Sequence, residues 1–281
     1  MSTPGAAYLH RHPRLRLAGV LGAPLIWLVV VYLGSLAALL LTSLWTQDSF
    51  TAEVVRIWTL DNFTSVLTEP LYREVLLRTV LVATAVTLID LALALPIAFY
   101  MAKVARPRVA KLLVVACLMP LWASYLIKAY AWRLLVIKDG VFEHTFGGSP
   151  GLGLVAVIMT LSYLWLPFMI LPVYAGLERV PDSHLEASED LGGRPWRTFR
   201  SVVWPAILPS VIAGSIFTFS LSLGDYISVN IVGGTSQMLG NLIYAQQTLD
   251  LPIAAATATL SVVVMAIYML LVRRTGALDR L

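Results

Sequence analysis

Acidic side chains are concentrated in one short segment between two long apolar stretches of this chain. The segment reads Glu186-Ala187-Ser188-Glu189-Asp190-Leu191-Gly192, a run of helix-forming residues that ends in glycine. Pro205 follows and opens the next apolar stretch. A charged helix placed this way can be a docking element for a partner protein, or it can be a solvated loop that binds nothing. The residues alone leave both interpretations open.

A second set of candidate residues lies inside or beside the apolar stretches. Asp90 falls near the middle of one of them, where a charge costs about 2.5–3.5 kcal/mol on insertion scales. It is either a pathway acid, a member of an intersubunit ion pair, or a protonated structural residue. Asp225 and Tyr226 lie where a later stretch ends; a carboxylate beside an aromatic ring suits an ammonium group, but a loop or capping role is equally open.

Aromatic residues follow helical spacing in a third stretch. Trp122, Tyr125, Ala129 and Trp132 predict a stripe along one helix face, which either packs in the core or holds a cationic amine. Lys128 and Arg133 in the same stretch can extend to the membrane surface or contact other chains.

Enzyme and nucleotide-binding motifs are missing from the sequence. Gly147–Gly151 has the Gly-x-Ser-x-Gly spacing of hydrolases, but Pro150 has no N–H for an oxyanion hole. No phosphate-binding Gly-x-x-x-x-Gly-Lys-Ser/Thr run occurs, and the four histidines are scattered. We therefore expect no catalytic residue, metal or cofactor in this chain, and any energy for transport must come from another subunit.

The elements that must position these residues are membrane helices. The chain has 281 residues, 58% of them hydrophobic and only 13% charged, with a mean hydropathy of +0.80. These values lie far from those of soluble domains, and the sequence pI of about 9.3 reflects basic loops rather than a nucleic-acid partner. Since about 20 apolar residues span a bilayer, we predict an all-α membrane protein with six spans: 18–45, 77–102, 112–136, 151–175, 202–223 and 252–272.

Lys and Arg set the orientation, because these residues accumulate in cytoplasmic loops. The segments predicted to lie on the same side of the membrane as the N-terminus are rich in these residues. The segments on the opposite side hold only Arg56, Arg73, Arg78 and Lys138. We therefore predict cytoplasmic tails at 1–17 and 273–281 and a cytoplasmic loop at 178–201. The basic residues expected inside are Arg11, Arg14, Arg16, Lys103, Arg106, Arg108, Lys111, Arg179, Arg194, Arg197, Arg200, Arg273, Arg274 and Arg280.

The cytoplasmic loop has its own helix signals. Pro181 stops the fourth span, and Ser183 and Glu186 have capping-box spacing for a new helix. Gly192 ends that helix, and Pro195 suits the first position of a second one. With Pro205 bending the entry into the fifth span, the loop is predicted to be a helix–turn–helix off the membrane.

The same residues resemble the EAA loop of ABC-importer permeases. That pattern is Glu-Ala-Ala, three residues, Gly, nine residues, then Ile-x-Leu-Pro. Here Glu186, Ala187, Gly192 and Pro205 match, while Ser188, Val202 and Trp204 replace Ala, Ile and Leu. Further stretches resemble the spermidine/putrescine-type permeases: 60–63, 69–72, 120–125, 128–133, 222–226, 233–234 and 241–244.

This resemblance implies a fold and a mechanism. The fold would be the type I permease fold of a multi-pass protein of the bacterial inner membrane. A helix at 183–191 would be the coupling helix, with Glu189 exposed. The chain would form half of a translocation pathway, with a second permease, two ATPase subunits that hold ATP and Mg, and an extracytoplasmic binding protein that delivers a small solute, most simply a polyamine such as spermidine or putrescine.

An ion-coupled secondary transporter that uses Asp90 as its proton carrier is the alternative. Such proteins usually contain internal repeats and broken helices. The sequence shows no convincing repeat, and all six apolar stretches read as continuous, so the importer is the better prediction.

Overall fold

The computed structural model describes residues 21–22, 24–48 and 50–274. The predicted tail 1–17, the beginning of the first span and residues 275–281 lie outside the described residues. Within the described part, five helices are long and apolar enough to cross a membrane. They are Pro24–Thr42, which ends in α3 (Gly34–Thr42); α5 (Pro70–Phe99) with η2 (Tyr100–Val104); α9 (Leu154–Glu178); Pro195–Leu223; and α15 (Leu251–Arg273).

The predicted third span is not one helix. It consists of α6 (Pro107–Trp122) and α7 (Tyr125–Val136), which meet at an angle of 94°. Ala123 and Ser124 have non-helical backbone between them (ψ 143° and 133°), and Pro120 removes a helical N–H just before the bend. Hydropathy cannot detect such a break because both halves are apolar. The expectation that no helix is broken was therefore wrong, and the described residues contain five spanning helices, or six if this bent pair is one span.

The predicted start of the fifth span also needs correction. Helix α11 (Pro195–Thr198), the π-helical turn η3 (Phe199–Val203) and α12 (Trp204–Leu223) form one uninterrupted run. The second helix of the predicted helix–turn–helix is thus the base of the span itself. The π turn ends two residues before Pro205, whose nitrogen cannot donate a hydrogen bond and whose ring crowds the carbonyl one turn earlier, so the helix widens there instead of ending.

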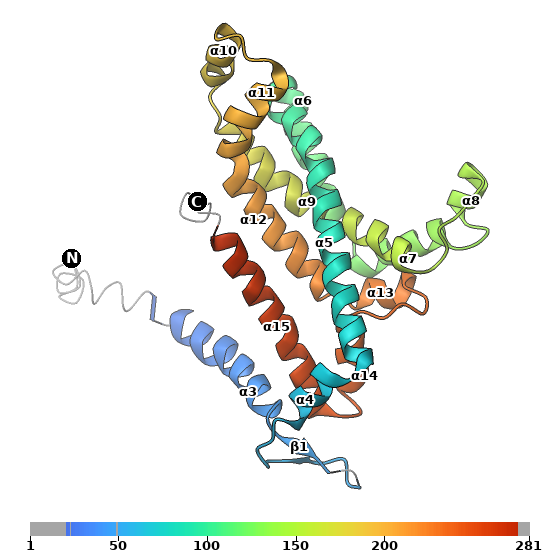
Figure 1. Cartoon of the computed structure of the whole chain (residues 1–281). Helices are drawn as coiled ribbons and strands as arrows, with labels where there is room; N and C mark the ends of the chain where they lie inside the picture. The colour runs from blue at the N-terminus through green and yellow to red at the C-terminus, as the bar shows by residue number, and fades with distance from the viewer. Residues whose placement is uncertain (1–20, 23, 49, 275–281) are drawn as a thin grey trace, which may run out of the picture.

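Helices α5, α9 and α12 form the centre of the molecule and pack against one another (Figure 1). Glycine permits the closest approach between α9 and α12: a Cβ on Gly176 would lie 2.5 Å from Ser210 Oγ, and one on Gly214 would lie 2.7 Å from Met169 Sδ. Small residues allow membrane helices to approach in this way. The buried residues Met169, Val173 and Ile207 complete this contact.

The two ends of the molecule are built differently (Figure 1). At one end lies α10 (Asp182–Asp190), which stands out from the bundle. At the other end lie the strands β1 (Thr46–Gln47) and β2 (Val54–Val55), paired antiparallel, with α4 (Asp61–Thr68) and α14 (Leu239–Gln246). The short helices α8 (Val141–Phe146) and α13 (Ile227–Val232) lie beside α7.

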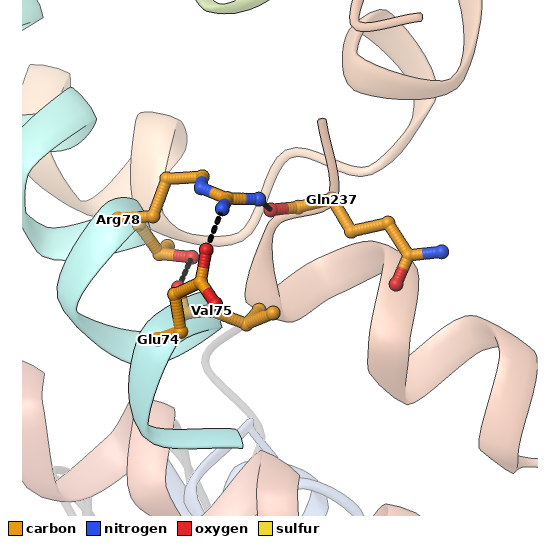
Figure 2. Close-up of polar contacts among 5 residues, drawn as sticks. Glu74, Val75, Arg78 and Gln237 are labelled. Atoms are coloured by element: carbon orange, nitrogen blue, oxygen red, sulfur yellow. Dashed lines mark hydrogen bonds and ion pairs between the residues drawn. The ribbon is translucent and has the colours of Figure 1, made fainter. Parts of the chain in front are cut away.

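Polar contacts fix the N-terminal part of α5 to the segment that precedes α14 (Figure 2). Arg78 pairs with Glu74 one turn earlier on α5 and donates to the carbonyl oxygen of Gln237 at 3.4 Å. The backbone N–H of Leu239 donates to Thr79 Oγ1 at 2.8 Å. These contacts hold the loop after α13 on α5 and so support the outer face of the bundle.

Candidate functional site

The loop that was predicted to be cytoplasmic presents α10 to solvent. Glu186, Glu189 and Asp190 are all exposed, as predicted. Leu191 is 89% exposed and Trp196 is 71% exposed, so two large apolar side chains accompany the acidic ones. Apolar anchors surrounded by charge are characteristic of protein-docking surfaces.

Two glycines end α10 in a Schellman motif. Gly192 has φ +74°, a conformation that glycine adopts without strain. Its N–H donates to the Glu189 carbonyl, and the N–H of Gly193 donates to the Ser188 carbonyl, both at 2.8 Å. The Ser188 hydroxyl lies 2.8 Å from that of Thr198 on α11. The turn therefore sets the position of α10 relative to the base of the fifth span, and the predicted glycine stop is confirmed.

The predicted capping box is wrong. Helix α10 begins at Asp182 with Pro181 at the N-cap and no side-chain cap, so Ser183 is already inside the helix and exposed. The extended backbone of Pro181 (φ −65°, ψ 140°) places the N-cap two residues before Ser183. The other loop residue of the pattern, Pro205, lies in the first turn of α12.

Between α10 and the fifth span lies an open groove of about 500 Å³, whose lining includes His184, Ala187, Leu191, Arg197 and Ser201.

Just after the end of α12, on the side predicted to be outer, Asp225 is held between α7 and α13. The Tyr125 hydroxyl donates to Asp225 Oδ2, and the backbone N–H of Ser228 donates to Asp225 Oδ1 at 2.8 Å. Asp225 is only 7% exposed. Burial raises the pKa of this carboxyl above its ordinary value, and its hydrogen bonds with Tyr125 and Ser228 oppose the rise.

A pocket of about 260 Å³ surrounds this carboxylate. Tyr125, Trp165 and Tyr226 contribute to its lining together with Asp225. The rings of Tyr125 and Trp165 are stacked with centroids 6.0 Å apart, and Tyr226 stacks on Tyr244 at 4.8 Å. A carboxylate among aromatic faces can bind an organic cation through charge and cation–π attraction.

The structure separates the other candidates from this pocket. Trp122 precedes the bend and is 87% exposed, so the predicted stripe is broken. Trp132 lies 5.5 Å from Tyr163 and 6.1 Å from Phe142, ring centroid to centroid, and packs on the core. Ala129 is buried in that same core cluster.

Asp90 is fully buried on α5 and does not line the outer pocket. Neither of its carboxylate oxygens has hydrogen-bond geometry with another described group. The sequence identified it as unusual, and the structure confirms that it faces the helix core. Trp165 was missed, because one tryptophan in the apolar fourth span carries no signal until α9 is placed beside α7.

The fold defines a multi-pass membrane protein in which α10 is exposed between the fourth and fifth spans. Residues 71–277 match the family described as binding-protein-dependent transport system inner membrane component. The chain belongs to this family, and it is the permease subunit of an ABC importer.

Relatives and solved structures agree. The chain is 42% identical to the inner membrane ABC transporter permease protein YdcU of Escherichia coli (strain K12), covering 100% of this chain and 97% of that one. It is 33% identical to the spermidine/putrescine transport system permease protein PotB of the same organism, over 90% and 94% of the chains. A bacterial alginate ABC transporter in complex with an alginate-bound periplasmic protein has the same fold, with a TM-score of 0.75, 14% identity and 96% coverage of both chains.

Membership of this family favours the importer over the ion-coupled transporter. The broken helix at residues 122–125 and the buried Asp90 are features that such a transporter would share. The family match extends across four of the five spanning helices, the bent pair of α6 and α7, and the loop that contains α10, and it therefore outweighs those two features.

Proposed function

We propose that this chain forms half of the translocation pathway for a polyamine such as spermidine or putrescine, and that α10 is its coupling helix. The observation that carries the solute class is the buried Asp225 carboxylate in an aromatic pocket at the outer end of α12. The extracytoplasmic binding protein would deliver the solute at this end of the chain.

The chemistry of the pocket suits a primary ammonium group. Tyr125, Trp165 and Tyr226 offer aromatic faces, and Asp225 offers the negative charge. Each such cation–π contact contributes about 0.5–2 kcal/mol depending on desolvation. The likeness to the spermidine/putrescine permease PotB supports the same class of solute.

ATP-driven movement would enter through α10. In this proposal two ATPase subunits hold ATP and Mg²⁺, and one of them seats Leu191, Trp196 and the acidic face of α10. A second permease completes the pathway. Both termini are cytoplasmic, on the side of α10, since basic residues dominate that side of the chain.

The proposal is tested by purifying the tagged chain in mild detergent and identifying what accompanies it. The expected result is a stoichiometric ATPase and a second permease. Reconstituted with the binding protein, that complex should take up radiolabelled putrescine only when ATP is supplied to the ATPase side. An ATPase complex that takes up no putrescine or spermidine would overturn the solute class, and a chain that purifies alone would overturn the coupling role.

A further inference from the structure

Lys103 connects the cytoplasmic end of α5 to the beginning of α10. Its Nζ donates to the carbonyl oxygen of Val180 at 2.6 Å and to Asp182 Oδ1 at 2.7 Å. Val180 lies in the turn that follows α9, and Asp182 is the first residue of α10. The Lys103 side chain is 10% exposed, so an ammonium group is held in a mostly buried position by two specific acceptors.

The two acceptors contribute unequally to holding the Lys103 ammonium group. Asp182 is 76% exposed in its side chain, and ion pairs of exposed groups contribute little. Val180 is 4% exposed, and a turn after a helix contains carbonyls without intrahelical partners. A charge-assisted bond to a buried carbonyl is among the stronger protein hydrogen bonds. The bond to Val180 is therefore the main anchor.

Helix α10 has few other attachments to the bundle. The chain joins it to α9 and to α11, and Ser188 contacts Thr198. Leu185 packs on the apolar cluster that contains Met101 and Val180. Lys103 adds the polar connection to α5, a helix to which α10 has no short covalent link.

We propose that Lys103 is a positioning residue that makes α5 move together with α10 when the ATPase acts on α10. This inference rests on the proposed function of α10. Helix α5 is continuous through η2 to Lys103, so a displacement at this end is transmitted to Asp90, about 20 Å away at 1.5 Å per residue. At the outer end the same helix holds Gln237 through Arg78 (Figure 2).

The test measures the separation of two spin labels in the complex of this chain with its copurified ATPase and second permease, in nanodiscs. The labels replace the exposed residues Leu88 on α5 and Leu270 on α15, and Cys117→Ser removes the native thiol. Trapping with ATP, Mg²⁺ and vanadate should change the separation in the otherwise native chain. Lys103→Met should abolish most of that change while the ATPase still copurifies, and Lys103→Arg should restore it.

Lys111→Met is the matched control, because Lys111 is an exposed lysine at the same end of the bundle, on α6. It should leave the nucleotide-dependent change intact. Asp182→Asn should cause a smaller loss than Lys103→Met. If Lys103→Met prevents assembly, Lys103→Gln, which keeps a donor for Val180, should give an intermediate change.

Two results would overturn the inference. The first is an unaltered change in Lys103→Met or in Lys103→Gln. The second is a fixed separation in the native complex although its ATPase hydrolyses ATP. Failure of the ATPase to copurify with the native chain is a different result, which removes the coupling role of α10 and this inference with it.

Discussion

In the loop between α9 and α12, the residues of the proposed docking surface and of its turn lie within one stretch, 182–205. In the outer pocket, Tyr125 comes from α7, Trp165 from α9 and Asp225 from the segment after α12. The loop is shaped by backbone bonds between near neighbours, such as Gly193 to Ser188. The pocket exists only because distant helices pack together. Substitutions of exposed side chains in the loop should therefore weaken partner binding with little change in the free energy of unfolding. Substitutions at the pocket should change both the affinity for the solute and the local packing.

Reversing one charge on α10 should have the largest effect. Glu186 is exposed, so Glu186→Lys should change the stability of the chain by no more than about 0.5 kcal/mol. Solute uptake should fall by about 100-fold. A partner surface that accepts the acidic face of α10 would meet a like charge in the new lysine, and like charges at a docking interface cost several kcal/mol. Transport by the reconstituted complex and its melting temperature measure the two quantities.

Glu53→Lys is the matched control, since Glu53 is an exposed acid at the opposite end of the molecule. It should leave uptake unchanged. Uptake at the native level in Glu186→Lys would show that α10 is a solvated loop and would remove the functional contrast between the two regions.

The carboxylate of the outer pocket should come second. Asp225→Asn keeps an acceptor for the Ser228 N–H but loses the charge, so the KM for putrescine should rise about tenfold, while binding of the ATPase is unaffected. Because burial raises the pKa of Asp225, the native KM should rise as pH falls through that raised pKa. Uptake rates across a pH series measure this.

The variant should lack this pH dependence. An Asp225→Asn protein with the native KM and the native pH profile would assign the residue to capping alone.

A pair of tryptophan variants sharpens the boundary of the pocket. Trp165 lines it, whereas Trp122 ends α6, before the bend, and is exposed. Trp165→Ala should raise the KM for putrescine by about twofold to thirtyfold, the range of a single cation–π contact of about 0.5–2 kcal/mol, and Trp122→Ala should not. Equal effects in the two variants would favour the predicted continuous aromatic stripe. They would contradict the conclusion that the bend separates Trp122 from the pocket.

The glycine that ends α10 should give the smallest effect. A Cβ on Gly192 meets no atom within 4 Å. Gly192→Ala should therefore lower the free energy of unfolding only through the strain of its positive φ of +74°, by about 1–2 kcal/mol. The melting temperature and the rate of uptake should both decrease modestly. Gly148→Ala is the control, because its Cβ also meets nothing and its φ is not positive. If both variants unfold alike, the turn does not fix the position of α10.

The amino-acid sequence alone determined the features that depend on composition and short-range order. Apolar runs are a direct consequence of the bilayer, so six spanning segments could be predicted, and Gly192 and Pro195 set helix boundaries through their own backbone restrictions. Ser183 was misread because capping depends on which residue begins the helix, and Pro181 set that beginning.

Tertiary structure decided the rest. The bend at Ala123 and Ser124 separates two equally apolar helices, and contacts of α7 with α13, including Arg133 Nη1 to the Ile231 carbonyl at 2.7 Å, hold its second half in place. The same packing brought Trp165 to Asp225 and Lys103 to Val180. Such pairs join residues that are far apart in the chain, and no local pattern specifies them, because their proximity depends on how whole helices fit together.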